Sequence, residues 1–175
     1  MKKTFLIFLI ILVSYCCCAQ QIERLSHREI EEDETPRAVA YNFVKYVIDR
    51  NNVGIYLHTT HLFYEELLEW KESAGVENLK ELFTRDYMHD IVDMGPVVKM
   101  GYDIVIYDSW ILDTDKYYGT YGETNPYAGL PAFSVSFTCA DANDNIYDGT
   151  YGEYDVTTRV LLVKVDNKWK VFGFK

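Results

Sequence analysis

The sequence predicts an α+β domain in which three N-terminal helices pack on one face of a curved antiparallel sheet. Apolar residues recur at three- and four-residue spacing between Thr35 and Val92, and they alternate singly after Pro96. A group of helices followed by a run of strands indicates that the helices gather on one face of the sheet. Residues 35–175 have a length typical of one domain, and no internal repeat is visible.

Residues 1–19 are predicted to form a secretory signal peptide. Lys2 and Lys3 precede an unbroken apolar run, Phe5 to Val13, and small residues lead to a cleavage site after Ala19. A retained membrane anchor is a weaker alternative, because a spanning helix needs about 20 apolar residues. The other alternative is a lipoprotein acylated on Cys16, Cys17 or Cys18. We therefore expect an exported protein, located in the periplasm, in the cell envelope or outside the cell.

Residues 20–34 are predicted to form an acidic, solvated linker, because they include the stretch REIEEDE. Loss of Lys2 and Lys3 from the 17 basic residues leaves 15 against 27 acidic residues, a formal charge of −12. This charge argues against nucleic acid as a partner, because such binding depends on Lys and Arg neutralising phosphates. Cleavage after Ala19 leaves Cys139 as the last cysteine, so we expect no internal disulfide and a buried, apolar role for Cys139.

Three helices are expected before the sheet, over residues 35–51, 55–72 and 76–92. The first begins at Thr35, whose hydroxyl can cap free amides, and has Pro36 at its first helical position. The second has a predicted break at Thr59 and Thr60. The third should end before Gly95-Pro96, because proline disrupts a helix interior.

The alternation after Pro96 predicts a long strand in which Tyr102, Ile104, Ile106 and Trp110 share one face, with Val105, Tyr107 and Ile111 on the other. A second strand alternates at Phe133, Val135 and Phe137. The stretch 117–131 between them is rich in Gly and Pro and is predicted to be a long loop.

The chain ends in a predicted hairpin, VLLVKVDNKWKVFGFK. A three-residue loop over residues 165–167 would oppose Val163 to Trp169 and Leu161 to Val171, which collects apolar residues on one face. The other face would hold Lys164, Lys168 and Lys170 together. A two-residue loop would leave both faces mixed, so the three-residue loop is predicted. The second face is apolar as well and needs a cover, from a homodimer partner or from the N-terminal segment. Its residues are Val160, Leu162, Phe172 and Phe174.

The order of three helices, a long strand after Gly95-Pro96 and the ending LLVKVDNKWKVFGF resembles the NTF2-like (SnoaL-like, cystatin-like cone) superfamily, especially its small exported bacterial members of unassigned function. The resemblance covers residues 35–175, with Trp169 in its most motif-like part. Members of this superfamily wrap a strongly bent sheet around a long helix, which leaves a cone-shaped cavity that Trp169 would help to close. The ligand-binding residues that this implies are Phe43, Phe63, Tyr102, Tyr107, Trp110 and Trp169.

Few residues indicate catalysis. His58, His61 and Glu65 have a helical spacing that suits metal ligands, yet no fourth ligand accompanies them, so neither a metal nor another cofactor is expected. The loop Asp141–Asn145 begins like a calcium-binding loop but lacks the required Gly and Glu. Enzymes of the NTF2-like superfamily often pair a His with an Asp in the cone. Here His61 and Asp108 would form that acid-base pair, with Asp108 on the same strand face as Ile104 and Trp110.

The leading hypothesis is an exported, noncatalytic binding or scaffold domain that holds a small apolar or amphipathic ligand, or a protein partner from the envelope, in or beside the cone. Tyrosines crowd the predicted loop and suit such binding; they are Tyr117, Tyr118, Tyr121 and Tyr127. The first alternative is an NTF2-like enzyme acting on a small carbonyl or polycyclic substrate. The second is an envelope assembly protein that works through its exposed sheet face.

Overall fold

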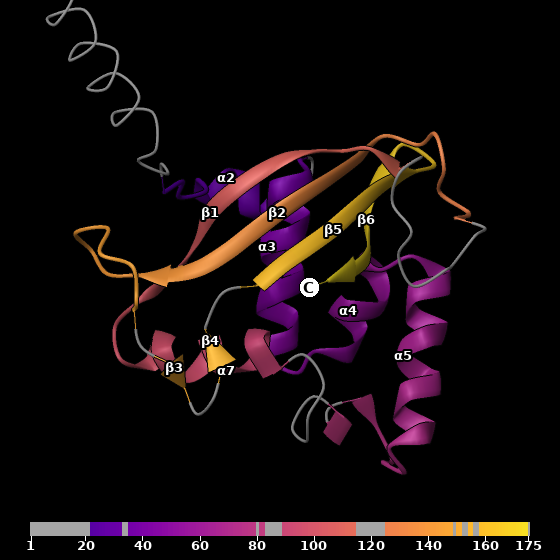
Figure 1. Ribbon diagram of the computed structural model, residues 1–175, viewed down its shortest axis with the longest axis horizontal. Helices are drawn as coiled ribbons and strands as arrows, with labels where there is room; N and C mark the ends of the chain where they lie inside the picture. The colour runs from indigo at the N-terminus through magenta and orange to yellow at the C-terminus, as the bar shows by residue number, and fades with distance from the viewer. Residues whose placement is uncertain are drawn as a thin grey trace, which may run out of the picture.

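The computed structural model describes residues 22–32, 35–79, 81–82, 89–114, 125–148, 150–151, 154–155 and 158–174, and these form an α+β structure, as predicted (Figure 1). The helices are α2 (His27–Glu32), α3 (Pro36–Ile48), α4 (Asn52–His58), α5 (His61–Ser73) and α7 (His89–Lys99). The strands are β1 (Asp103–Leu112), β2 (Ala132–Ala140), β3 (Thr150–Tyr151), β4 (Tyr154–Asp155), β5 (Thr158–Val165) and β6 (Lys168–Phe174). None of the described helices is long and apolar enough to cross a membrane. The predicted signal peptide lies outside the described residues.

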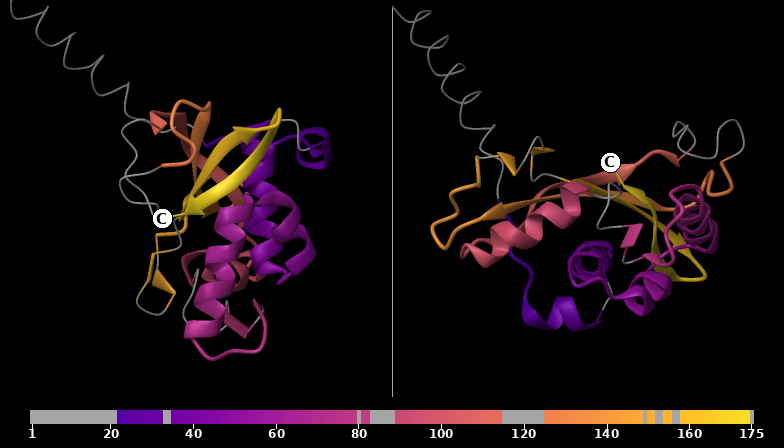
Figure 2. Two further views of the ribbon diagram at one scale, coloured as in Figure 1. Left: turned by 90° about the vertical axis from the view of Figure 1, so that its right-hand side faces the viewer. Right: turned by 90° about the horizontal axis from the view of Figure 1, so that it is seen from below.

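Four strands form one antiparallel sheet in the order β1-β2-β5-β6, so β1 and β6 are its two edges. β3 and β4 pair separately as a short ribbon. α3 lies under the middle of the sheet, where it contacts β2, β5 and β6. α7 contacts β1 and β2, whereas α4 and α5 contact β6, so these helices cover one face of a curved, open sheet (Figure 2).

The first helix starts where the sequence predicts. Thr35 is the N-cap of α3 and accepts a hydrogen bond from the amide of Ala38 (3.1 Å), and Pro36 occupies the first helical position. The predicted break at Thr59 and Thr60 is also confirmed, because these two residues separate α4 from α5. Capping chemistry therefore predicted the boundaries correctly at these two places.

The prediction that Gly95-Pro96 ends the third helix is wrong, because α7 continues through both residues to Lys99. Pro96 removes one hydrogen bond from the helix. Burial of apolar side chains opposes this cost, because Ile91, Met94 and Val97 recur at three-residue spacing and are fully buried. Burial of one large apolar side chain contributes about 1.5–3 kcal/mol, so three of them outweigh the lost bond.

A bulge interrupts the alternation of β1. Ile106 and Asp108 pair with successive residues of β2, which leaves Tyr107 as an extra residue. The extra residue moves every later side chain to the opposite face. The predicted sharing of one face by Asp108, Trp110 and Ile106 is therefore wrong, and Asp108 is exposed on the side away from the helices.

The last hairpin turns through two residues, so the predicted three-residue loop is wrong. Asp166 and Asn167 both have positive φ, 48° and 63°, as in a type I′ turn, and Lys164 pairs with Trp169. Trp169 therefore shares a face with a lysine, whose Nζ lies 5.8 Å from the indole centre. The turn matches the twist of the strands, and the cation lies over the ring, so the mixed faces are stable.

Apolar side chains are buried on both faces of the sheet. The main core lies between the helices and the sheet and contains Phe43, Phe63 and Phe137, each at most 2% exposed. A smaller cluster lies on the other face; its buried members are Tyr127, Leu161, Val163 and Phe172. The predicted second face is wrong as a set, because a register shift in the β5–β6 pairing places Val160 and Leu162 in the main core and Phe172 in the smaller cluster. Each of these three residues is at most 1% exposed, so they are covered without a second subunit, and the homodimer stays a prediction.

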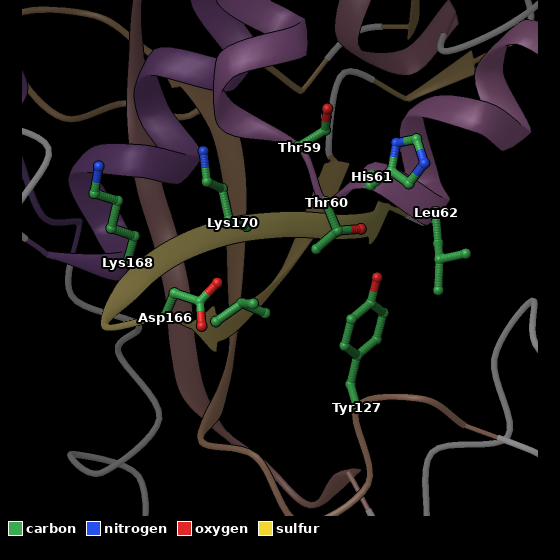
Figure 3. Close-up of a pocket in the computed structure, with 9 residues that line it drawn as sticks. Thr59, Thr60, His61, Leu62, Tyr127, Asp166, Lys168 and Lys170 are labelled. Carbon is green, nitrogen blue, oxygen red and sulfur yellow. The ribbon is translucent and has the colours of Figure 1, made fainter.

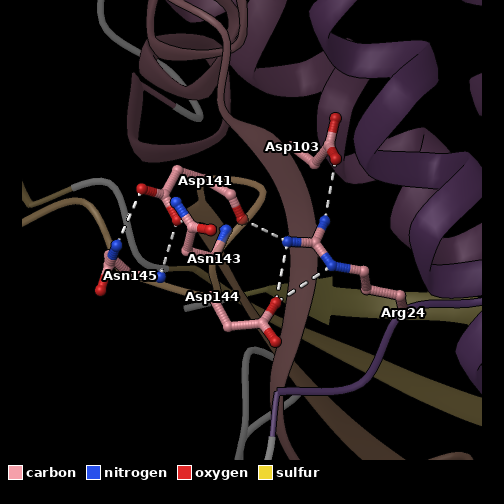
Figure 4. Close-up of polar contacts among 6 residues, drawn as sticks. All are labelled: Arg24, Asp103, Asp141, Asn143, Asp144 and Asn145. Atoms are coloured by element: carbon pink, nitrogen blue, oxygen red, sulfur yellow. Dashed lines mark hydrogen bonds and ion pairs between the residues drawn. The ribbon is translucent and has the colours of Figure 1, made fainter.

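Residues 22–32, in the predicted linker, contact the domain. Glu23 and Ile106 exchange two backbone hydrogen bonds (3.0 and 3.1 Å) along the edge of β1. Arg24 donates to the carboxylates of Asp103 (2.8 Å) and Asp144 (2.9 Å), as Figure 4 shows. The start of the described stretch therefore lies as a strap along the sheet edge, and α2 packs on α3, although most of the charged side chains are exposed.

Candidate functional site

A groove of about 510 Å³ lies between the α4–α5 junction and the β5–β6 hairpin (Figure 3). We call it the hairpin groove. Its apolar surface comes from Leu62, Tyr127 and Val165, and its charged groups come from Lys168 and Lys170 among others. The remaining lining residues are Thr59, Thr60, His61 and Asp166. Such a volume lies within the range of about 300–1,000 Å³ that is typical of small-molecule sites.

One wall of the hairpin groove is fixed by backbone pairing. The amide of Thr60 donates to the carbonyl of Val171 (2.8 Å), and Thr59 forms a parallel bridge with Val171. The Thr60 hydroxyl then accepts from the amide of Phe63 (3.3 Å) and caps α5. The first turn of α5, which begins at His61, is thus positioned directly on the edge strand.

Tyr127 forms the opposite wall. Its backbone amide donates to the side chain of Asn125 (2.9 Å), and its ring packs against Phe172 with 5.4 Å between ring centres. The residue is 7% exposed. In Figure 3 its hydroxyl points across the groove toward Thr60 and His61. A polar group therefore tops an otherwise apolar wall.

The groove has a local excess of positive charge in a chain whose formal net charge is −10. Lys168 and Lys170 lie on one side, with Asp166 as the acidic lining residue. Lys170 also donates to the carbonyl of Leu57. His61 lies 3.7 Å from Glu65 and its side chain is 80% exposed.

A second hollow, of about 630 Å³, lies on the helix side of β6, and we call it the inner hollow. Trp169 and Lys164 line it together with Val39 of α3. The indole packs against Phe133 with 6.5 Å between ring centres. Lys168 and Lys170 line both hollows, so the start of β6 separates two recesses.

The structure scatters the ligand-binding residues predicted from the resemblance. Phe43 and Phe63 are buried in the core, and Tyr102 packs on Tyr147. Tyr107 lies at the bulge, and Trp110 lies on the far face of the sheet beneath Arg159. Of this predicted set, Trp169 is the residue that lines one of the hollows described above.

The predicted acid-base pair is not brought together. His61 starts α5, which packs at β6, whereas Asp108 is on β1 at the opposite edge of the sheet. The Asp108 carboxylate accepts a hydrogen bond from the amide of Ser109 (2.8 Å) and is exposed. One small substrate cannot contact both groups across four strands.

No group of three metal-ligand side chains occurs among the described residues. His58 Nδ1 lies 2.7 Å from the carbonyl of Gly54 and therefore carries the proton that it donates. In the loop Asp141–Asn145, the first carboxylate accepts the amides of Asn143 (2.8 Å) and Asn145 (2.9 Å), as Figure 4 shows. This is the turn chemistry of an Asx-rich loop.

Burial raises the pKa of three described side chains, Tyr41, Glu66 and Cys139. Burial raises the pKa of the Cys139 thiol to about 12, so this fully buried cysteine is unreactive at neutral pH, in keeping with its predicted apolar role. Burial, with repulsion from Glu69, raises the pKa of Glu66 from 4.5 to about 7. Neither Glu66 oxygen has a hydrogen-bond partner within the described parts of the chain.

Sequence reasoning missed the lysines of the groove. The sorting of apolar residues that predicted the hairpin loop placed Lys168 and Lys170 on the face opposite Trp169 and assigned them no role. The sequence indicates Tyr127 as one of several loop tyrosines, and the other three lie outside the described residues. The sequence also predicts a helix break at Thr60, but the pairing of Thr60 with a strand distant in sequence has no local signal. The chain matches no protein-family model, no curated protein and no solved structure at a significant level.

Proposed function

We propose that this protein is a noncatalytic binding domain that holds a small amphipathic ligand with an anionic group in the hairpin groove. The observation that carries the proposal is the lining of the groove, in which the apolar residues Leu62, Tyr127 and Val165 occur together with the two lysines Lys168 and Lys170. A net charge of −10 repels anions from most of the surface. A local pair of lysines beside an apolar wall therefore favours one class of ligand, with an acyl or aromatic body and a carboxylate or phosphate head.

We also propose that the protein is exported and that its fold is of the NTF2-like type. The character of residues 1–19 supports export. The curved, open sheet over α3 and the order of helices before strands support the fold. Phe43, Phe63 and Phe137 are buried in the core between the helices and the sheet, so we propose that the ligand binds in the hairpin groove and not in a central cone. His61 and Asp108 lie at opposite edges, and we therefore do not propose the enzyme alternative.

Calorimetric titration with sodium decanoate tests this function, with decyltrimethylammonium bromide as the probe of equal chain length and opposite charge. We expect decanoate to bind at least tenfold more tightly, which corresponds to about 1.4 kcal/mol. Lys168→Gln and Leu62→Asn should each weaken decanoate binding severalfold. Both positions are exposed, so folding should survive. Lys99→Gln, at the end of α7, is the matched control and should change nothing. Equal binding of the two probes, or an unaffected Lys168→Gln variant, would refute the proposal.

A further inference from the structure

We propose that the first half of β6 is a docking edge for an extended acidic peptide, which adds to the sheet as a further strand beside Trp169. The proposal goes beyond the small-ligand function, because it depends on the backbone of the edge strand. Its occupant is a segment of another protein with acidic and apolar residues in alternation.

One backbone group on the outer side of β6 already forms a hydrogen bond to another segment of the chain. Val171 accepts a hydrogen bond from the amide of Thr60 (2.8 Å), so the carbonyl of Val171 points outward from the sheet. Backbone groups two residues apart on a strand point to the same side, and the amide and carbonyl of Trp169 therefore point outward too. No described residue outside the hairpin pairs with them. A strand laid there would continue the pairing that Thr59 and Thr60 begin.

The two hollows lie where the side chains of such a strand would go. Successive side chains of a strand point to opposite faces. One set would enter the hairpin groove beside Val165, and the alternate set would enter the inner hollow beside Trp169. Main-chain bonds would supply affinity, and the two recesses would supply selectivity.

Charge specifies the occupant. Lys164, Lys168 and Lys170 flank the turn of the hairpin, and together they outnumber the two carboxylates that line the hollows, Asp166 of the turn and Glu32 of α2. Lysines on an edge strand also protect proteins from unwanted strand pairing. The lysines repel a second copy of this edge, because that copy carries the same positive charges. They also disfavour a neutral strand, which offers no carboxylates to pair with them. An acidic strand is attracted instead, so the same residues exclude self-pairing and admit a partner of opposite charge.

The test uses the full-length protein and a blocked hexapeptide of alternating glutamate and valine. Two matched peptides accompany it: one of alternating lysine and valine, and one acidic peptide methylated on alternate backbone nitrogens. The methylated peptide keeps its charge but cannot form the ladder of hydrogen bonds. We expect the acidic peptide to bind in calorimetry and to shift the backbone amide resonance of Trp169. Binding should weaken at least tenfold for the lysine peptide, for the methylated peptide and for Lys168→Glu. Lys99→Glu should leave it unchanged.

Several results would overturn the proposal: no binding of the acidic peptide, equal binding of either matched peptide, an unshifted Trp169 amide in the complex, or a Lys168→Glu variant that binds normally. The two proposals fail separately. If the protein binds the acidic peptide but does not bind decanoate, the small-ligand function alone is rejected. Decanoate has no backbone amide, so backbone methylation tests the docking edge alone. If the methylated acidic peptide binds as tightly as the unmethylated one, the docking edge is rejected and the small-ligand function is not.

Discussion

Replacement of Glu66 by glutamine should remove a pH-dependent destabilisation of the fold. Burial raises the pKa of Glu66 in the folded state from 4.5 to about 7, with repulsion from Glu69 as the second cause. A carboxyl with a raised folded pKa binds its proton more tightly when folded. Its contribution to stability is therefore fully present below pH 4.5 and is lost as the pH rises through 7. The wild-type protein should thus lose stability between pH 5 and pH 8 at this site.

The size of the effect follows from the pKa and from the exposure of the side chain. One pKa unit corresponds to about 1.36 kcal/mol, so the difference between 4.5 and 7 has an upper limit of about 3.4 kcal/mol. Both Glu66 oxygens are buried without a hydrogen-bond partner among the described residues, but the residue as a whole is only half-buried. Water therefore screens part of the penalty, and we expect about 1–2 kcal/mol.

Urea unfolding followed by tryptophan fluorescence at pH 5, 6, 7 and 8 measures this effect. The free energy of unfolding of Glu66→Gln should exceed that of the wild type by about 1–2 kcal/mol more at pH 8 than at pH 5. The difference in free energy of unfolding between the variant and the wild type removes the contribution of every group that titrates equally in both proteins. Glu72→Gln removes an exposed charge from the same helix, and its curve should run parallel to that of the wild type. Parallel curves for wild type and Glu66→Gln would refute the reasoning.

Three further substitutions test local features, each by the midpoint of urea unfolding. Gly54→Ala should destabilise by about 1–3 kcal/mol, because its Cβ would lie 2.5 Å from the Tyr46 ring; an unchanged midpoint would mean that the ring moves freely. Thr60→Ala should cost about 1 kcal/mol through loss of the cap on the Phe63 amide, whereas Thr60→Ser should retain most of it. Asn167→Gly should stabilise by about 0.5 kcal/mol, because glycine adopts the positive φ of 63° without strain; a destabilised variant would contradict the type I′ turn.

The sequence predicted those parts of the fold that depend on local chemistry. Thr35 caps α3 because its hydroxyl and the following Pro36 act within one turn of helix. The change from helical to alternating spacing predicted helices before strands, because each period follows from backbone geometry alone. Thr59 and Thr60 interrupt the second helical stretch for a similarly local reason, since Thr60 caps the amides that follow it.

The features that the sequence analysis missed depend on contacts between distant parts of the chain. The bulge at Tyr107 is a property of the pairing of β1 with β2, and it displaced Asp108 from its predicted face. α7 continues through Pro96 because its apolar residues are buried under the sheet. The local preference of proline for helix ends takes no account of such burial. The pairing of Thr60 with Val171 joins residues more than a hundred positions apart. In each case tertiary burial or pairing outweighed a local preference.

The hairpin is where the failed prediction and the candidate site coincide. Sorting of apolar residues predicted one clean face, with Lys164, Lys168 and Lys170 together on the other. The type I′ turn instead places Lys164 over Trp169 on the helix side and leaves Lys168 and Lys170 between the two hollows. Sequences depart from consistent patterning mostly at functional or strained positions. A mixed strand at the edge of the sheet, in a chain of opposite overall charge, therefore supports our proposal of an anion site at the hairpin.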